Sequence, residues 1–198
     1  MNLQNYNFSK NKKLDEDLSF KNLNLFLEIS KEKKINCFLL FGTLLGFYRD
    51  KKFINEDNDT DIGCTWEEFK IVERDFFSKL TSSGFKIYRE SNSLIQIVKN
   101  NNHIDLYIFR KLPFFNGRFS GKFFISNLHF KTISSIKLVF NGYDYPILSE
   151  VEKLLTKFYG KNWKTPLKGK TANENILLKI MVKILPTRII KFIQKMLK

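Results

Sequence analysis

The sequence has few of the residues that staple small scaffolds or build the common zinc sites. Its 198 residues include two cysteines, Cys37 and Cys64, and two histidines. Two cysteines without CxxC spacing predict buried reduced thiols, not a disulfide framework, and no His or Cys pair has the spacing of zinc ligands. With 43% hydrophobic and 15% aromatic residues, a chain of this length can bury a core that needs no such support. We therefore expect a globular domain.

Long apolar runs are also missing. No uncharged apolar stretch approaches the roughly 20 residues that cross a bilayer. Residues 1–13 are polar where a signal peptide would be apolar. We therefore expect a cytoplasmic protein.

Acidic residues are scarce in one part of the chain. The formal net charge is +14, but residues 1–152 carry 22 basic and 19 acidic groups, whereas residues 153–198 carry 12 basic groups and one acidic residue, Glu174. This predicts a nearly neutral body followed by a basic tail, which we place over residues 167–198. Most of the cations are Lys, and Asn, Ile and Phe are abundant, as in proteins of AT-rich genomes. Net charge is therefore weak evidence for nucleic-acid binding, and we expect no specific nucleic-acid partner.

Apolar periodicity predicts alternating helices and strands. Helices are expected over residues 15–34, 43–48, 66–82 and 149–159, the last with a capping box from Ser149 to Glu152. Strands are expected over residues 35–41, 60–64, 85–89, 94–98 and 103–109, with a hairpin of residues 137–140 and 143–147 around Asn141-Gly142. Residues 113–131 stay unassigned. The predicted fold class is α/β (α+β), with a mixed β-sheet flanked by helices.

Three aspartates are the main candidates for chemistry. Asp59 and Asp61 are two residues apart on a predicted strand, so both carboxylates should lie on one face, roughly 6.5 Å apart. Asp105 lies in the predicted strand 103–109. If these strands are neighbours, about 4.8 Å apart, the three carboxylates meet. They then form a constellation that binds one or two Mg²⁺ ions for phosphoryl or nucleotidyl transfer. Taken alone, Asp-x-Asp is more often a turn or cap feature.

Gly42 and Thr43 lie where a predicted strand passes into a helix. Backbone N–H groups at such a position can receive a phosphate, and the Thr hydroxyl adds a donor. Glycine lets the phosphate approach the backbone. The alternative is an ordinary strand end.

The stretch over residues 38–69, FLLFGTLLGFYRDKKFINEDNDTDIGCTWEEF, resembles the signature of the LicD/fukutin family within the nucleotidyltransferase-fold superfamily. A second segment over residues 159–166, YGKNWKTP, resembles the closing YGxxWxxP segment of that family. The two matches bracket about residues 35–166. The resemblance implies a nucleotidyltransferase-like catalytic domain over residues 1–166.

The resemblance also implies an activity. Members of the family transfer a phosphorylated small alcohol, such as phosphocholine or an alditol phosphate, from a CDP-activated donor to a hydroxyl of a cell-surface glycan such as lipopolysaccharide, capsule or teichoic acid. The implied partners are the CDP-linked donor and the glycan acceptor, which a lipid can carry. Mg²⁺ is the implied cofactor, with Mn²⁺ as an alternative.

Site roles follow from the same resemblance. Asp59 and Asp61 would bind the catalytic metal, and Asp105 would complete the triad. Asp57 would be an auxiliary metal ligand at the entrance of the cluster. The donor diphosphate would be bound by Gly42, Thr43 and Arg49.

Other polar and aromatic residues are expected to have lesser roles. For Tyr159 and Trp163, we favour packing over closure of the donor site. His103 is expected on a strand surface or behind the metal ligands, and His129 is expected to point to solvent.

The tail contains a stretch, residues 176–198, with no acidic residue and with cations mostly three or four residues apart among apolar side chains. Pro186 should break it into two short helices. A basic amphipathic helix of this kind binds anionic membrane surfaces, whereas a terminal helix packed on the core has the same pattern. A lipid-carried acceptor favours peripheral attachment to the inner face of the cytoplasmic membrane.

Three other functions fit parts of the pattern. A nucleotidyltransferase that moves NMP from an NTP to a small molecule or RNA needs the same aspartates. A basic nucleic-acid-binding module would use the tail. A non-catalytic family member is suggested by Asn58, which replaces an acidic residue of the family's aspartate cluster.

Overall fold

The structure is a computed structural model that describes residues 14–89, 91–112, 115–131 and 136–166. The predicted tail over residues 167–198 lies outside these ranges, so its helices and its membrane contact stay predictions. Within the described ranges, no helix is both long enough and apolar enough to cross a membrane.

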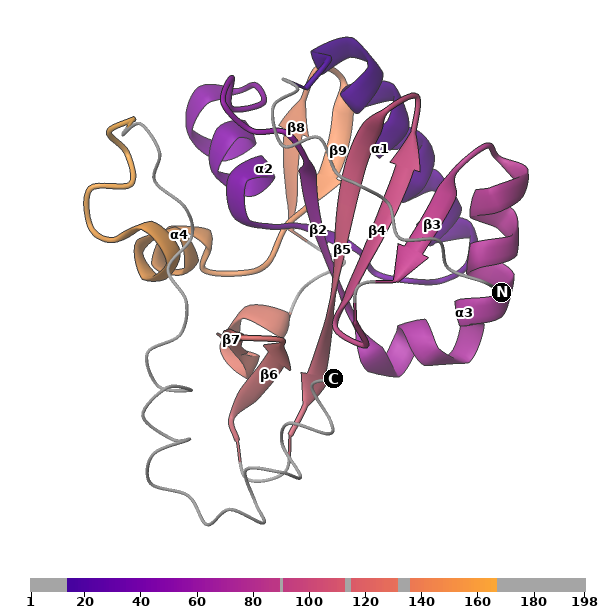
Figure 1. The fold of residues 1–198 in the computed structure, drawn as a ribbon. Helices are drawn as coiled ribbons and strands as arrows, with labels where there is room; N and C mark the ends of the chain where they lie inside the picture. The colour runs from indigo at the N-terminus through magenta and orange to yellow at the C-terminus, as the bar shows by residue number, and fades with distance from the viewer. Residues whose placement is uncertain (1–13, 90, 113–114, 132–135, 167–198) are drawn as a thin grey trace.

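A mixed sheet forms the centre of the molecule, as predicted (Figure 1). Five strands follow the order β1-β2-β5-β4-β3, and β6 and β7 extend the sheet from β5. Strands β2 and β5 run parallel, and the other neighbours pair antiparallel. The strands are β1 (Phe38–Leu39), β2 (Thr60–Thr65), β3 (Lys86–Arg89), β4 (Leu94–Lys99), β5 (Asn102–Lys111), β6 (Gly117–Ser120) and β7 (Phe123–Ser126).

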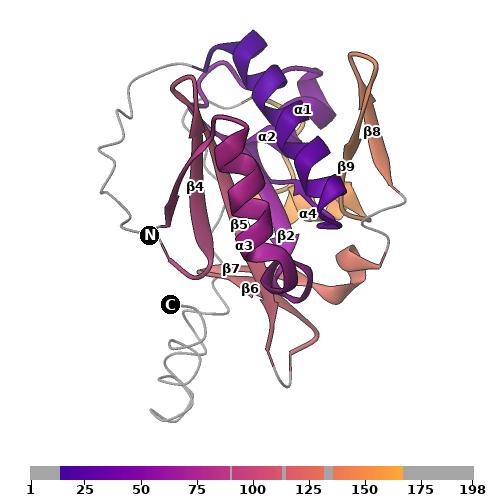
Figure 2. The same ribbon diagram turned by 90° about the vertical axis from the view of Figure 1, so that its right-hand side faces the viewer.

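Helices α1 (Glu16–Glu32) and α3 (Trp66–Ser82) cover one face of the sheet (Figure 2). Both were predicted from apolar residues at helical spacing. The Asp15 side chain caps α1 by accepting a hydrogen bond from the Leu18 N–H. The core between the layers consists of buried apolar side chains of the helices and of alternate strand residues, among them Leu23, Phe26, Phe76, Leu80, Ile62, Ile95, Ile97, Ile104 and Leu106.

The chain turns from strand to helix earlier than predicted. Strand β1 is only two residues long, and α2 (Phe41–Leu45) follows at once, continued by the π-helical turn η1 (Gly46–Asp50). The predicted strand 35–41 and helix 43–48 were therefore wrong in their bounds. The backbone at Phe41 has a φ of 39°, which breaks the extended path. An apolar run alone does not separate a buried strand from a buried helix.

The predicted hairpin is confirmed as β8 (Lys137–Phe140) and β9 (Tyr143–Pro146), a separate two-stranded sheet. Asn141 and Gly142 have φ values of 47° and 76°, as a tight two-residue hairpin turn requires. Strand β9 packs beside β1.

Two predictions near α4 (Val151–Tyr159) were wrong for one reason. Residues 127–130 form the short helix η2 (Asn127–Phe130), which lies against the start of α4. The Ser149 hydroxyl donates to the carbonyl oxygens of Leu128 and His129, so it does not cap the helix. His129 is buried, with its Nδ1 2.8 Å from the Ser149 carbonyl oxygen, and does not point to solvent.

Both cysteines are buried and reduced, as predicted. Burial raises the pKa of the Cys37 thiol to about 12, which keeps the thiol protonated and unreactive.

The sequence left residues 113–131 unassigned. In the structure, β6, β7 and η2 lie in this segment.

Candidate active site

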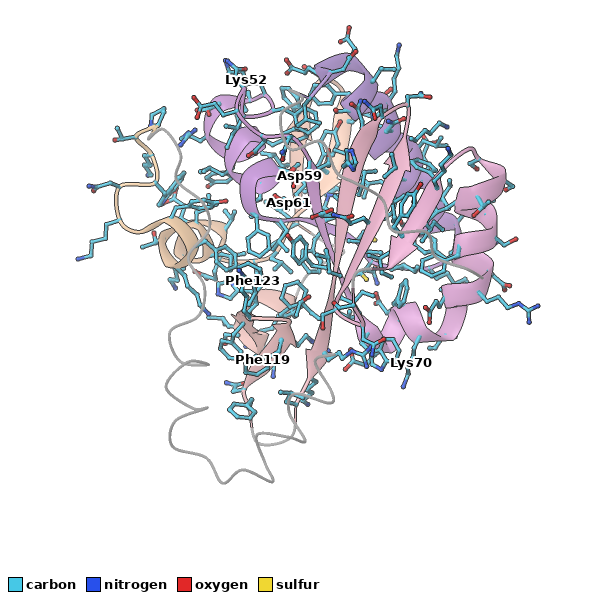
Figure 3. All side chains as sticks on the ribbon, in the orientation of Figure 1. Lys52, Asp59, Asp61, Lys70, Phe119 and Phe123 are labelled. Atoms are coloured by element: carbon cyan, nitrogen blue, oxygen red, sulfur yellow. The ribbon has the colours of Figure 1, made fainter. Side chains whose placement is uncertain are left out.

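Two of the predicted carboxylates come from adjacent strands. Asp61 of β2 pairs in register with Asp105 of β5, and the two side chains are only 7% and 8% exposed. Asp59 directly precedes β2. Figure 3 shows Asp59 and Asp61 between α2 and the centre of the sheet. The expectation that the strands bearing these aspartates are neighbours is confirmed.

The carboxylates lie on the sheet face that α1 and α3 leave uncovered. Side chains alternate between the two faces of a strand, and the neighbours Ile62, Ile104 and Leu106 are fully or almost fully buried in the core. Asp61 and Asp105 therefore point away from that core. The fold places acidic groups on one side of a sheet whose other side is purely apolar at these positions.

Burial, followed by electrostatic repulsion, disfavours the ionised carboxylates of this cluster. Burial raises the pKa of Asp61, and the negative charges of Asp59, Asp105 and Asp57 raise it further. Burial, followed by the charges of Asp59 and Glu56, raises the pKa of Asp57 to about 7. Within the described part of the chain, no positive charge contributes to the pKa of Asp57, Asp59 or Asp61. The cluster is therefore strained as long as its carboxylates are ionised.

Gly42 and Thr43 hold Asp61 in place. The Gly42 N–H donates to Oδ2 of Asp61 over 3.0 Å, and the Asp61 N–H donates to the Thr43 hydroxyl oxygen over 2.8 Å. The Thr43 hydroxyl still has its own proton to donate. A Cβ at position 42 would collide with the Asp57 carboxylate, so glycine is required for this close approach. The role of both residues toward a phosphate stays a prediction.

Arg49 has partners within the protein. Its Nε and Nη2 donate to the Asp50 carboxylate over 2.8 and 2.6 Å, and its Nη1 donates to the Trp163 carbonyl oxygen over 3.1 Å. Trp163 is buried, and its ring lies 5.9 Å from that of Tyr48. Arg49 thus joins η1 to the segment after α4. Its predicted contact with the donor diphosphate is not tested by this arrangement.

An aromatic cluster borders the carboxylates, and pattern reasoning did not identify it. Tyr107 lies two residues after Asp105 on β5 and so shares its face. The Phe41 ring packs against Tyr107, Phe123 and Phe158, with centroid distances of 4.9, 4.3 and 4.9 Å. Tyr107 and Phe123 are half-buried. The i, i+2 spacing from Asp105 was the signal that could have found Tyr107.

The two aromatic residues of the closing segment are packing residues, as expected. Tyr159 is 3% exposed and Trp163 is 5% exposed. Tyr159 nevertheless lies close to the acidic cluster, because burial and then the charges of Asp61, Asp57 and Asp59 raise the pKa of its phenol. His103 is buried, which lowers its pKa. It is not a surface residue, but it shares the carboxylate face of β5.

The residue types of the acidic cluster suit a divalent cation, although their side chains are not already arranged around one. Buried carboxylates that raise one another's pKa are stabilised when a cation lies between them. Among the described residues, no group of three or more His, Cys, Asp or Glu side chains is already arranged around one metal position. The metal role of Asp59, Asp61 and Asp105 therefore stays a prediction.

One solved structure supports a nucleotidyltransferase-like assignment of this fold, and a second was also found. The solution structure of the antibiotic-resistance factor ANT(2″)-Ia is similar with a TM-score of 0.51 at 10% sequence identity, covering 77% of each chain. A crystal structure of ANT(2″)-Ia in complex with adenylyl-2″-tobramycin has a TM-score of 0.47 at 12% identity, covering 74% of this chain and 79% of that chain. The first likeness establishes the nucleotidyltransferase-like fold.

The chain belongs to the LicD/FKTN/FKRP family, because residues 34–141 match the nucleotidyltransferase domain of that family. This confirms the resemblance seen in residues 38–69. Comparison with curated proteins gave no match. Family and fold together support a transferase of the phosphotransferase or nucleotidyltransferase type.

Proposed function

We propose that this protein moves a phosphorylated small alcohol, of the phosphocholine or alditol phosphate type, from a CDP-activated donor to a hydroxyl of a cell-surface glycan. The observation that carries the proposal is the in-register pair Asp61 and Asp105, buried side by side in a chain of the LicD/FKTN/FKRP family. Buried like charges destabilise a fold, so they are found mainly where function requires them.

Asp59, Asp61 and Asp105 would hold Mg²⁺ or Mn²⁺, and Asp57 would be the auxiliary ligand. Such a cation polarises phosphoryl oxygens and neutralises the charge that develops on them. The chain itself keeps Asp61 oriented through the Gly42 N–H and the Thr43 hydroxyl. This orientation does not depend on a bound ligand, so one carboxylate of the site is already held in place.

The aromatic cluster supports a donor that carries a flat base. The half-buried rings of Tyr107 and Phe123 lie 5.9 Å apart beside the carboxylates, and Figure 3 shows Phe123 on the side of β7. Aromatic rings stack on nucleobases with little dependence on base identity. A cytidine at these rings would leave its diphosphate near Asp61 and Gly42.

The proposed reaction is an in-line displacement at phosphorus. The acceptor oxygen forms a bond to the distal phosphorus of the donor while the bond from that phosphorus to the bridging oxygen breaks. CMP leaves with the electron pair, and the acceptor proton passes to Asp105. Asp105 suits this role by its position, because it lies in register with Asp61 on the carboxylate face.

The test is CMP release from a panel of CDP-linked donors, CDP-choline, CDP-ribitol and CDP-glycerol, with Mg²⁺, the full chain and either a methyl glycoside or water as the acceptor. Asp59→Ala and Asp61→Ala are expected to abolish release. Asp75→Ala, which removes an exposed carboxylate on α3, should release CMP like the wild type. Release that persists in Asp61→Ala, or that is equal with and without Mg²⁺, would contradict the proposal.

A second candidate, nucleotidyl transfer from an NTP, is favoured by the fold shared with ANT(2″)-Ia. It uses the same carboxylates but leaves NMP on the product and releases pyrophosphate. Pyrophosphate release from an NTP panel, without CMP release from any CDP-linked donor, would select this candidate.

A further inference from the structure

One lateral row of side chains leads from the carboxylates across the sheet. Asp61 pairs with Asp105, Asp105 pairs with Gln96 of β4, and Gln96 pairs with Tyr88 of β3. Directly paired residues of neighbouring strands point to the same face. The row therefore runs over four strands on the carboxylate face, and with strands about 4.8 Å apart Gln96 is the immediate neighbour of Asp105.

The row opens toward solvent as it leaves the carboxylates. Asp61 and Asp105 are buried, Gln96 and Tyr88 are half-buried, and Lys86, two residues from Tyr88 on β3, is exposed. Helix α2 packs on β2, and among the described elements no helix lies in front of β4 and β3 in Figure 1. Gln96 and Tyr88 therefore keep part of their side-chain surface exposed beside the buried carboxylates.

Gln96 is a polar residue in an apolar strand. Its neighbours Ile95 and Ile97 are fully buried in the core, so the alternation of β4 fixes its amide on the carboxylate face. No hydrogen bond joins this amide to another described residue. A half-buried amide that the fold does not use, with two donors and an acceptor, is free to bind hydroxyl groups.

In-line transfer separates the two substrates. The attacking and leaving oxygens lie on opposite sides of the phosphorus. In the proposed function, the leaving CMP lies toward Tyr107 and Phe123, which continue along β5 and over to β7. Gln96 lies beside Asp105 on β4, whereas Tyr107 and Phe123 lie further along β5 and on β7, so Gln96 is placed away from the leaving group and available to the acceptor.

We propose that the acceptor is a sugar or polyol that binds across β4 and β3, with Gln96 as a specificity-determining residue that hydrogen-bonds its hydroxyls. The Tyr88 ring adds an aromatic surface for the ring face of a sugar, since Tyr combines an apolar body with a polar tip. This inference rests on the proposed function for the identity of the reaction, but sugar binding at this face can be measured without any donor.

The experiment is saturation-transfer NMR with the full chain, Mg²⁺ and CMP, using the methyl glycosides of galactose, glucose, N-acetylglucosamine and N-acetylgalactosamine as probes. Gln96→Met keeps the side-chain length and removes its donors and acceptor. We expect at least one glycoside to bind the wild type and to bind Gln96→Met roughly tenfold more weakly, as for loss of one to two hydrogen bonds.

Two controls separate binding from folding. Val139→Ala changes an exposed strand position on β8 and should bind glycosides like the wild type. Gln96→Asn keeps the amide and should recover part of the affinity. Equal binding by wild type and Gln96→Met, or no binding of any probe to the wild type, would overturn the inference. CMP release from CDP-linked donors by the wild type and by Asp61→Ala, assayed separately without glycoside so that water is the acceptor, reports on the proposed function alone.

Discussion

The two faces of the central sheet differ in what they contribute. On the face toward α1 and α3, alternate residues of β4 and β5 such as Ile97 and Leu106 are fully buried and apolar. On the opposite face, Asp105 and Gln96 come from the same two strands and lie beside Asp61. Burial of apolar surface stabilises the first face, whereas buried charges of one sign destabilise the second. One set of strands thus supplies stability on one side and chemistry on the other.

Asp61→Asn is expected to have the largest effect, with turnover and stability changing in opposite directions. We expect turnover to fall by roughly a thousandfold, equivalent to about 4 kcal/mol of transition-state stabilisation. The free energy of unfolding of the metal-free protein should rise, because one of several repelling buried charges is removed. CMP release and urea unfolding check the two effects. Loss of activity together with loss of stability would show that Asp61 mainly supports the fold.

The opposite result is expected from Leu106→Ala on the apolar face. Leu106 is fully buried next to Asp105 in sequence, and its truncation should lower the free energy of unfolding by about 2–5 kcal/mol. Turnover per folded molecule should change little, because the carboxylate face is untouched. Urea unfolding and CMP release at a temperature where the variant is folded measure this. A large fall in turnover would mean that the faces are not separable.

Gly42→Ala tests the contact between α2 and the carboxylates. A Cβ at this position would collide with the Asp57 carboxylate, so Asp57 must move and the geometry of the cluster must change. We expect turnover to fall roughly tenfold to a hundredfold, which corresponds to about 1.4–2.7 kcal/mol. Adding Asp57→Ala to Gly42→Ala should relieve the collision, and a double-mutant cycle measures the coupling. Additive effects of the two changes would contradict the predicted contact.

The stability of the metal-free protein should also depend on pH. The pKa of Asp57 is raised from its ordinary 3.8 to about 7 by burial and by the charges of Asp59 and Glu56. The folded protein therefore binds a proton that the unfolded chain has released. Its free energy of unfolding should fall as the pH rises from about 4 to about 7 and should level off above that.

Urea unfolding in EDTA measures this fall, and Asp57→Asn should make it shallower. Mg²⁺ should reduce it in the wild type, because a cation stabilises the ionised carboxylates. A fall of equal size in Asp57→Asn would assign the pH dependence to other groups.

Sequence patterns predicted those parts of the fold that depend on local spacing. The helices around Phe26 and Phe76 and the Asn141-Gly142 hairpin follow from periodicity and turn chemistry. The start of α2 was missed, because an apolar run serves buried strands and helices equally. Ser149 has the sequence of a capping box, but tertiary contacts with Leu128 and His129 take its hydroxyl instead.

In the candidate site, too, local spacing predicts some residues and misses those that only the folded chain brings together. Asp59 and Asp61 were predicted from their spacing, and Asp105 from an assumed strand neighbour that the register confirms. Gln96 was not predicted, because its place beside Asp105 depends on the pairing of β4 with β5, which no local pattern encodes. The partners that occupy Arg49, namely Asp50 and the Trp163 carbonyl, likewise come together only in the folded chain.

The most direct test of the central claim compares the two faces in one assay. Wild type, Asp61→Asn and Leu106→Ala are incubated with Mg²⁺ and the CDP-linked donor panel, and CMP release is expressed per folded molecule. The account predicts comparable release by wild type and Leu106→Ala and almost none by Asp61→Asn. Release by Asp61→Asn at the wild-type rate would contradict the assignment of the chemistry to the carboxylate face.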